Sequence, residues 1–145
     1  NGAMRVPENM RDWVTAQFGS LEAVASQRVV RLTNNITGEE TIFNSLRALR
    51  PCDTREKTNV SLDSLDMGTD SFADPRENTP EDIFGRIEGR RCITAGNIAK
   101  CDELHGLVIF KNSHPLKWNK EEVSDYIDTA WRWHQRLRSK NSAVR

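Results

Sequence analysis

Two cysteines and two histidines lie close together in the stretch GRRCITAGNIAKCDELHGLVIFKNSHPLKW, residues 89–118. Cys92, Cys101, His105 and His114 carry the nitrogen and sulfur donors that a tetrahedral zinc site requires. No pair among them has the C-x-x-C or H-x-x-x-H spacing that brings ligands together easily, and a strand would alternate them between its two faces. We therefore predict ordinary buried cysteines and no metal site, because free cysteine is among the most buried residue types.

A cysteine nucleophile activated by His105 is the second chemistry that these residues suggest. The pairing of Cys101 or Cys92 with a histidine in a loop is weak evidence, and nothing in the chain resembles a nucleophile elbow. The chain also has no P-loop and no G-x-G-x-x-G motif for holding phosphates. We expect His105 to begin a buried strand and to hydrogen-bond the backbone, and we predict no catalytic residue and no cofactor.

Basic residues gather at two further places. Arg86, Arg90 and Arg91 in GRIEGRR could bind an anion, although solvated charges beside a turn are the favoured interpretation. The segment WRWHQRLR, residues 131–138, mixes tryptophans with arginines that could stack on RNA and neutralise it. An exposed Trp133 at the edge of the helix stripe would more often mark a protein contact than a nucleotide contact.

Length and composition limit the classes of protein to consider. The 145 residues are enough for one domain with a real core. The formal net charge is zero, so a charged partner would have to be recognised by a local patch. No apolar stretch approaches the roughly 18 residues that span a bilayer, so no membrane partner is expected. Three cysteines without a C-x-x-C spacing fit an intracellular, reducing compartment.

Hydrophobic periodicity and turn signals predict the elements that would position these residues. The pattern predicts a helix over 10–25 with a break near Gly19 and a cap at Asn9, and a helix starting at Thr79 with Pro80 at its first position. Residues 106–110 look apolar enough to form a central strand buried on both faces. The remaining predicted elements are a β-hairpin with strands at 28–33 and 40–44, a helical turn in 45–51, a polar loop at 52–78, and strands at 86–88 and 91–99.

The last helix, predicted over 119–139 with Asn119 as its cap, is the clearest element. Its apolar residues repeat at helical spacing and should lie across the sheet. These residues are Val123, Tyr126, Ile127, Ala130, Trp131, His134 and Leu137.

The elements together predict one α+β domain over 9–138, with an antiparallel sheet and the long C-terminal helix packed on it. The N-terminal helix is placed at an edge of the sheet or in a partner contact. Residues 1–8 are expected to be a cloning remnant or disordered lead, and 139–145 a frayed basic tail.

The segment TPEDIFGRIEGRRCITAGNIAKCDELHGLVIFKNSHPLKWNKEEVSDYIDTAWRWHQR resembles the galactose-1-phosphate uridylyltransferase-like branch of the histidine-triad (HIT) superfamily. In that family a strand like HGLVIF precedes an HPL turn and a long helix. The upstream RVVRLTNNITGEETIFNSLRALRP resembles the family's opening hairpin, so the resemblance covers most of residues 28–136. The chain stops before the strand that carries the family's nucleophilic His-x-His motif, and only Cys52 stands where relatives have a metal-binding cysteine pair.

The resemblance implies half of a nucleotidyltransferase fold without its nucleophile. We therefore predict a noncatalytic protein-interaction or assembly module derived from that fold, which docks through Trp13, Phe18, Trp133 and Arg136. The alternative is an N-terminal fragment of a uridylyltransferase-like enzyme that binds a nucleotide or sugar nucleotide. Its pocket would use Arg86, Asn97, Lys100 and His105. An RNA-associated domain is the third hypothesis. An unpaired sheet edge favours a homodimer or a protein partner.

Overall fold

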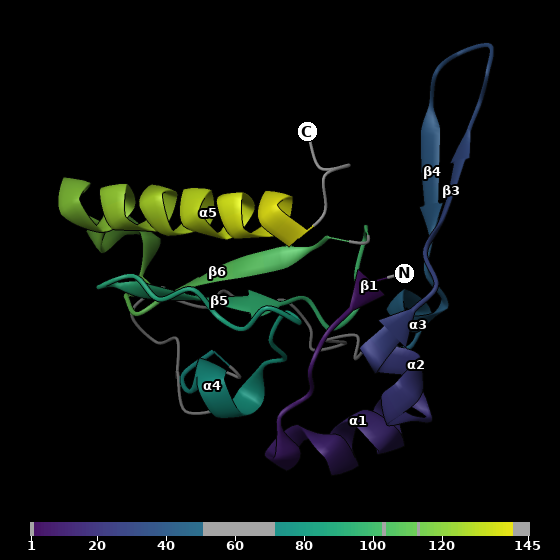
Figure 1. Ribbon diagram of the computed structural model, residues 1–145, viewed down its shortest axis with the longest axis horizontal. Coiled ribbons are helices and arrows are strands. Elements are labelled where there is room, and N and C mark those ends of the chain that lie inside the picture. Colours follow the sequence, from purple (N-terminus) through teal and green to yellow (C-terminus); the bar gives the residue numbers. More distant parts are fainter. Residues whose placement is uncertain (1, 51–71, 103, 113, 141–145) are drawn as a thin grey trace, which may run out of the picture.

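The computed structural model describes residues 2–50, 72–102, 104–112 and 114–140. Most of the polar loop predicted at 52–78 and the end of the basic tail lie outside this range. The fold is α+β, as predicted, with pairs of short antiparallel strands, helices near the N-terminus and one long C-terminal helix (Figure 1). Within these described ranges the strands form three separate two-stranded sheets rather than one continuous sheet.

The predicted N-terminal helix is present, and it breaks where expected. A 3-10 turn, η1 (Glu8–Met10), leads into α1 (Arg11–Phe18), and α2 (Leu21–Ala25) follows. Gly19 between them has a φ of 87°, which favours glycine. Ser20 caps α2 by accepting a hydrogen bond from the Ala23 N–H. The predicted cap at Asn9 is wrong, because Asn9 lies inside η1 and its side-chain amide donates to Glu77.

Residues near the start of the chain belong to the fold. β1 (Gly2–Ala3) pairs with β2 (Ser26–Gln27) in antiparallel fashion. The Met4 side chain is buried in the N-terminal core, so the expectation of a disordered lead is wrong for residues 2–8. The buried members of this core are Met4, Met10, Val14, Phe18, Val24, Leu46 and Ala99.

The predicted hairpin is confirmed as β3 (Val30–Thr33) and β4 (Glu40–Phe43), with Val30 opposite Phe43 and Leu32 opposite Thr41. The short helix α3 (Ser45–Ala48) follows. Asn44 caps it by accepting a hydrogen bond from the Leu46 N–H at 3.0 Å. Figure 1 shows the hairpin as an arm that projects from the body of the molecule.

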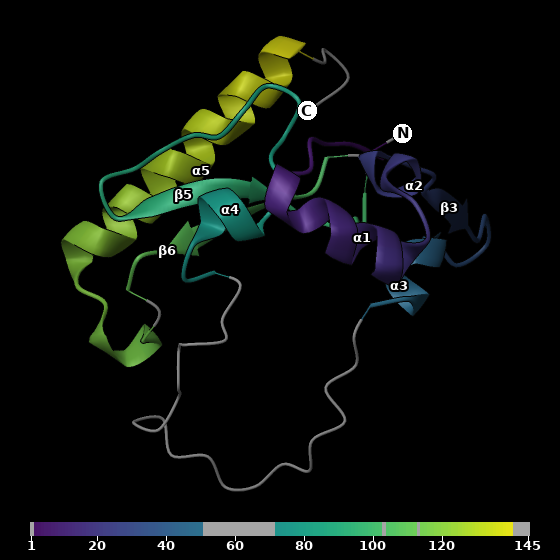
Figure 2. The same ribbon diagram turned by 90° about the horizontal axis from the view of Figure 1, so that it is seen from below.

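The C-terminal half is built on a second antiparallel pair, β5 (Cys92–Gly96) and β6 (Gly106–Phe110). α5 (Lys120–Lys140) lies over one side of this pair and α4 (Pro75–Asn78) over the other, as both ribbon views show (Figures 1 and 2). A 3-10 turn, η4 (Pro115–Lys117), connects β6 to α5. No helix in the described ranges has both the length and the apolar character needed to cross a membrane.

The prediction that the strand at 106–110 is central is wrong. Among the described residues β6 pairs with β5 alone, and most of its residues are only half-buried. β5 is the fully buried strand. Its other edge is satisfied by the backbone of the preceding turn, through the Thr94 N–H to the Ile87 carbonyl and the Gly89 N–H to the Cys92 carbonyl, each at 2.9 Å.

The helix predicted to start at Thr79 is also absent, because α4 ends where that helix should begin. The Thr79 hydroxyl donates back to the Pro75 carbonyl. Glu81 then exchanges two backbone hydrogen bonds with Arg5, at 2.8 and 2.9 Å, which hold it in an extended bridge. The strand expected at 86–88 is reduced to the single bridge of Glu88 with Ile93. Backbone pairing with the distant Arg5 therefore takes the place of the helix that the local sequence predicts at Thr79.

Candidate functional site

The start of α5 is fixed by a reciprocal capping box. The Asn119 side-chain oxygen accepts a hydrogen bond from the Glu122 N–H at 2.9 Å, and the Glu122 carboxylate accepts from the Asn119 N–H at 3.1 Å. Both groups would otherwise be among the unpaired donors of a helix N-terminus. The predicted cap at Asn119 is confirmed.

A buried carboxylate, Asp125, joins α5 to the turn before β5. Its oxygens accept hydrogen bonds from the backbone N–H groups of Arg90, at 3.2 Å, and Arg91, at 2.6 Å. These bonds stabilise the charged form and lower the pKa of Asp125 against the opposing effect of burial. Gly89 packs so closely that an added Cβ would lie 2.4 Å from the Thr129 hydroxyl oxygen. Asp125 and Thr129 therefore lie on the face of α5 that is turned toward the body of the protein.

Aromatic side chains complete the inner face of α5. The Tyr126 ring stacks on Phe110 with the ring centroids 3.9 Å apart, and Trp118 meets Phe110 edge-on. The Trp133 indole N–H donates to the Asp82 carboxylate at 2.7 Å. Because this ring lies directly against Gly106, the predicted exposed Trp133 is wrong: the side chain is half-buried.

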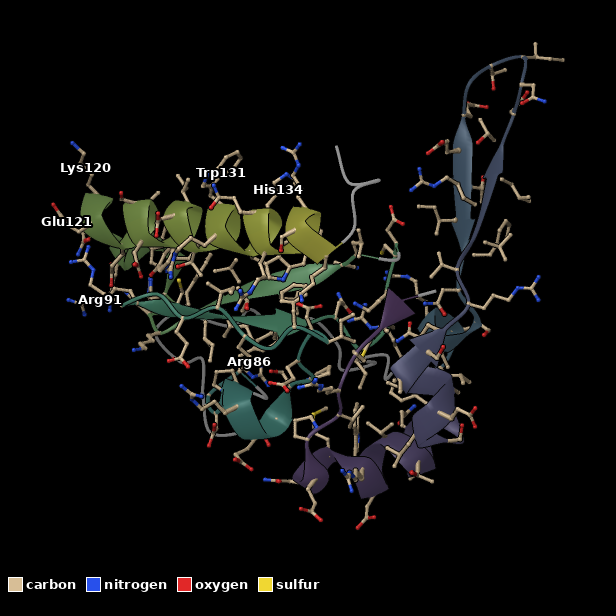
Figure 3. The ribbon with its side chains drawn as sticks, in the orientation of Figure 1. Arg86, Arg91, Lys120, Glu121, Trp131 and His134 are labelled. Carbon is tan, nitrogen blue, oxygen red and sulfur yellow. The ribbon has the colours of Figure 1, made fainter. Side chains whose placement is uncertain are left out.

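The remaining apolar residues of α5 face outward. Val123, Ile127 and Trp131 are 39%, 66% and 56% exposed, and His134 stacks on Trp131 with the ring centroids 5.7 Å apart. We call these four residues the outer stripe. Figure 3 shows Trp131 and His134 on the side of the helix that points away from the sheet.

The orientation predicted for α5 is therefore wrong in its main point. Of the seven residues assigned to the sheet-facing stripe, only Tyr126 and Leu137 are buried. The physical reason is that Asp125 and Thr129 contact residues 89–91 from the inner side of α5. Ile127 lies on the opposite side of the helix, so rotating α5 to bury Ile127 would break those contacts. The sequence pattern identifies the residues of the outer stripe but predicts that they face the sheet, whereas they face away from it.

The hairpin carries a second exposed apolar surface. Opposite residues of an antiparallel pair share a face, so Val30, Leu32 and Phe43 lie together on one side of β3 and β4. Leu32 is 57% exposed and Phe43 54%. The opposite side is mixed: it carries Arg31, bonded to Asp102 at 2.6 Å, and the exposed Ile42 that pairs with Arg31. We call Val30, Leu32 and Phe43 the hairpin face.

The other residues predicted for an interaction surface are dispersed. Phe18 is a core residue, so its prediction as a surface residue is wrong. Trp13 is exposed in part, and its ring meets Phe18 edge-on at 5.7 Å. Arg136 is exposed on α5.

Three of the four residues predicted to bind a nucleotide lie together. Lys100 is 1% exposed, and its ammonium lies 3.3 Å from the His105 carbonyl oxygen and 3.9 Å from the Asp82 carboxylate. Burial lowers the pKa of Lys100 in spite of Asp82. The His105 Nδ1 accepts the Cys101 N–H at 3.0 Å, the backbone hydrogen bond that was predicted. Burial and the nearby Lys100 lower the pKa of His105, which favours the neutral ring.

The contacts of Asn97 and Arg86 are also with protein groups. The Asn97 side-chain oxygen accepts the Ala99 N–H at 3.1 Å, and its amide nitrogen lies 3.3 Å from the His105 Nε2. Arg86 donates to the carbonyls of Thr79, at 2.6 Å, and Thr94, at 3.0 Å, away from that cluster. Burial lowers the pKa of Arg86, with Glu81 opposing it.

The two cysteines considered for a metal site have different surroundings. Cys92 lies under α5 against Asp125, where burial raises the pKa of its thiol. Cys101 accepts a hydrogen bond from Arg47 instead. Across the residues that the structure describes, no three His, Cys, Asp or Glu side chains are placed to hold a metal ion.

The three arginines considered for RNA binding differ in their surroundings. Arg132 donates to the Asp128 carboxylate and to the Glu88 carbonyl, both at 2.9 Å, whereas Arg136 and Arg138 are exposed.

No family model matches this chain, and neither a curated protein nor a solved structure matches it significantly.

Proposed function

We propose that this chain is a noncatalytic protein-interaction module that docks through the outer stripe of α5 and the hairpin face. The observation that carries the proposal is the exposure of Val123, Ile127 and Trp131 on one side of a well-anchored helix. Contiguous apolar patches of this kind mark docking sites on proteins. Tryptophan at the centre of such a patch is a common source of binding energy.

The polar chemistry of the described residues supports a docking role over a catalytic one. The raised thiol pKa keeps Cys92 protonated, and a protonated thiol is a poor nucleophile. The side-chain nitrogens of Lys100 and Arg86 already contact protein oxygens. A phosphate would have to displace those contacts before it could bind.

Affinity capture with matched baits tests the proposal. The baits are the wild type, Ile127→Asp on the outer stripe, and Ile83→Asp as a control, because Ile83 is a similarly exposed isoleucine, 53%, outside both docking surfaces. Quantitative mass spectrometry should recover a bound protein with the wild type and the control and lose it with Ile127→Asp. Recovery of the same proteins by all three baits would count against the proposal. Circular dichroism confirms that each bait is folded.

A further inference from the structure

We infer that the partner is a second copy of this chain, with the hairpin face of each copy packed on the outer stripe of the other. The inference rests on the proposed function, because it assigns an occupant to the two docking surfaces named there.

The hairpin supplies the first argument. A two-stranded hairpin is at best marginally stable in water, and it needs a further strand or a covering helix on its apolar face. β3 and β4 pair only with each other among the described residues, and Val30, Leu32 and Phe43 stay exposed. Both ribbon views show the arm standing away from α5 of its own chain (Figures 1 and 2). A helix from a second copy would provide the missing cover.

The outer stripe is the matching surface. A strand face and a helix stripe are two surfaces that bury each other in α+β packing. At about 3.3 Å per residue, the four-residue strand β3 is roughly 13 Å long. At 1.5 Å per residue, the outer stripe from Val123 to His134 is about 17 Å long. The paired strands can therefore lie along most of the outer stripe, and Figure 1 shows the arm rising on the side that the outer stripe faces.

Charge complementarity sets the direction of the contact. Glu39 lies at the hairpin tip and Arg28 at its base, and no ion pair joins either to another described residue. On α5, Glu121 lies at the N-terminal end, and Arg136 and Arg138 lie near the C-terminal end. Laying the tip toward the C-terminal end brings Glu39 to the arginines, and at the other end Arg28 meets Glu121 with the exposed Lys120 beside it, so the tip sets the direction. Screening by salt makes this contribution modest, so it orients the contact while the apolar residues hold it.

A two-fold axis makes the contact twice. Each chain gives one hairpin and one helix, so two equivalent contacts close the assembly as a dimer and cover all four apolar surfaces. This closure leads to a specific test, because a chain with a damaged hairpin still has an intact helix.

Sedimentation equilibrium of four proteins tests the inference: the wild type, Leu32→Asp on the hairpin face, Ile127→Asp on the outer stripe, and the control Ile83→Asp. The wild type and the control should be dimers, and each surface variant should weaken the dimer roughly tenfold or more. An equimolar mixture of Leu32→Asp and Ile127→Asp should associate more tightly than either variant alone but less tightly than the wild type, because one of its two contacts joins an intact hairpin to an intact helix. Phe43→Asp replaces Leu32→Asp if the latter does not fold.

Other outcomes would overturn the inference in distinguishable ways. A wild type that stays monomeric at every concentration overturns it, while the capture experiment decides separately whether another protein binds the same surfaces. A dimer that Ile127→Asp breaks but Leu32→Asp leaves intact excludes the hairpin contact. A mixture that associates no more tightly than either variant alone counts against the reciprocal arrangement.

Discussion

Asp125 ties α5 to the turn before β5. Its carboxylate replaces water for two backbone N–H groups in the turn before β5, and its pKa is lowered as a result. N–H groups without partners cost free energy, so Asp125 fixes the inward face of α5 together with the buried Tyr126, Thr129 and Leu137.

Replacing this carboxylate gives the first prediction. Asp125→Asn should lower the free energy of unfolding by about 1.5–3 kcal/mol at neutral pH, because hydrogen bonds to a charged acceptor are lost. Urea unfolding measures the change. The control Asp128→Asn, at an exposed carboxylate that bonds Arg132, should change stability by well under about 1 kcal/mol.

The same pair of proteins has an expected pH dependence. A carboxyl whose pKa is lowered by folding contributes stability above its unfolded pKa, about 4, and loses that contribution as the pH falls through the folded value. The difference between the wild type and Asp125→Asn should therefore shrink below about pH 4. A difference that stays constant down to the lowest pH at which the protein folds would contradict the role given to this carboxylate.

Ligand binding at the predicted nucleotide residues can be tested on the wild type. We expect no saturable rise in melting temperature with UMP, UDP-glucose, AMP or ATP, because the side-chain nitrogens of Lys100, Arg86 and Asn97 are already in contact with protein groups. A ligand at about 100 times its Kd would add roughly 2.7 kcal/mol to stability, which a thermal-shift titration detects easily. A saturable shift would restore the nucleotide-binding alternative.

At the scale of elements, α5 has two rows of apolar residues, and the row that is buried is the one interspersed with polar residues. Tyr126, Trp133 and Leu137 face the protein together with polar residues, while Val123, Ile127 and Trp131 face outward. The inner row was visible in the sequence as the spacing of 7 and 4 residues between its members. Periodicity alone does not separate this row, because Tyr126 and Leu137 share the predicted stripe with Val123, Ile127 and Trp131.

This assignment predicts a contrast between two truncations. Leu137→Ala should cost about 2–5 kcal/mol, the usual loss for a buried leucine. Ile127→Ala should cost well under about 1 kcal/mol in the monomer, because its side chain is exposed. Both are measured by urea unfolding of dilute protein. Equal losses would mean that α5 packs with the opposite face inward.

At the scale of the whole molecule, a buried polar junction connects the N-terminal helices to the connection between β5 and β6. Gln27 is 1% exposed, and its side chain donates to the carbonyls of Val24 and Ile98. Its oxygen accepts from the Asn44 amide at 2.8 Å and from the Lys100 N–H at 3.0 Å. One side chain thus satisfies partners from three separate segments.

Removing this junction should destabilise the whole chain. Gln27→Leu should cost at least about 2 kcal/mol, because it leaves several buried donors and acceptors unpaired. The control is Gln17→Leu, a less buried glutamine that donates to one carbonyl, that of Leu49, and it should cost less than about 1 kcal/mol. Thermal and urea unfolding measure both. Similar losses for the two variants would exclude a special role for the junction.

The sequence by itself determined the α+β class, the hairpin, the break at Gly19 and the bounds of α5, because caps, turns and periodicity act over a few residues. Only the tertiary structure decided which face of α5 is buried and which surfaces stay exposed. The backbone N–H groups that Asp125 satisfies are 34 and 35 residues away in the chain, and the Arg5 backbone that displaced the predicted helix at Glu81 is more distant still. Local patterns carry no information on contacts between residues so far apart in the chain. The contacts of Asp125 are among those that leave the outer stripe of α5 on the surface.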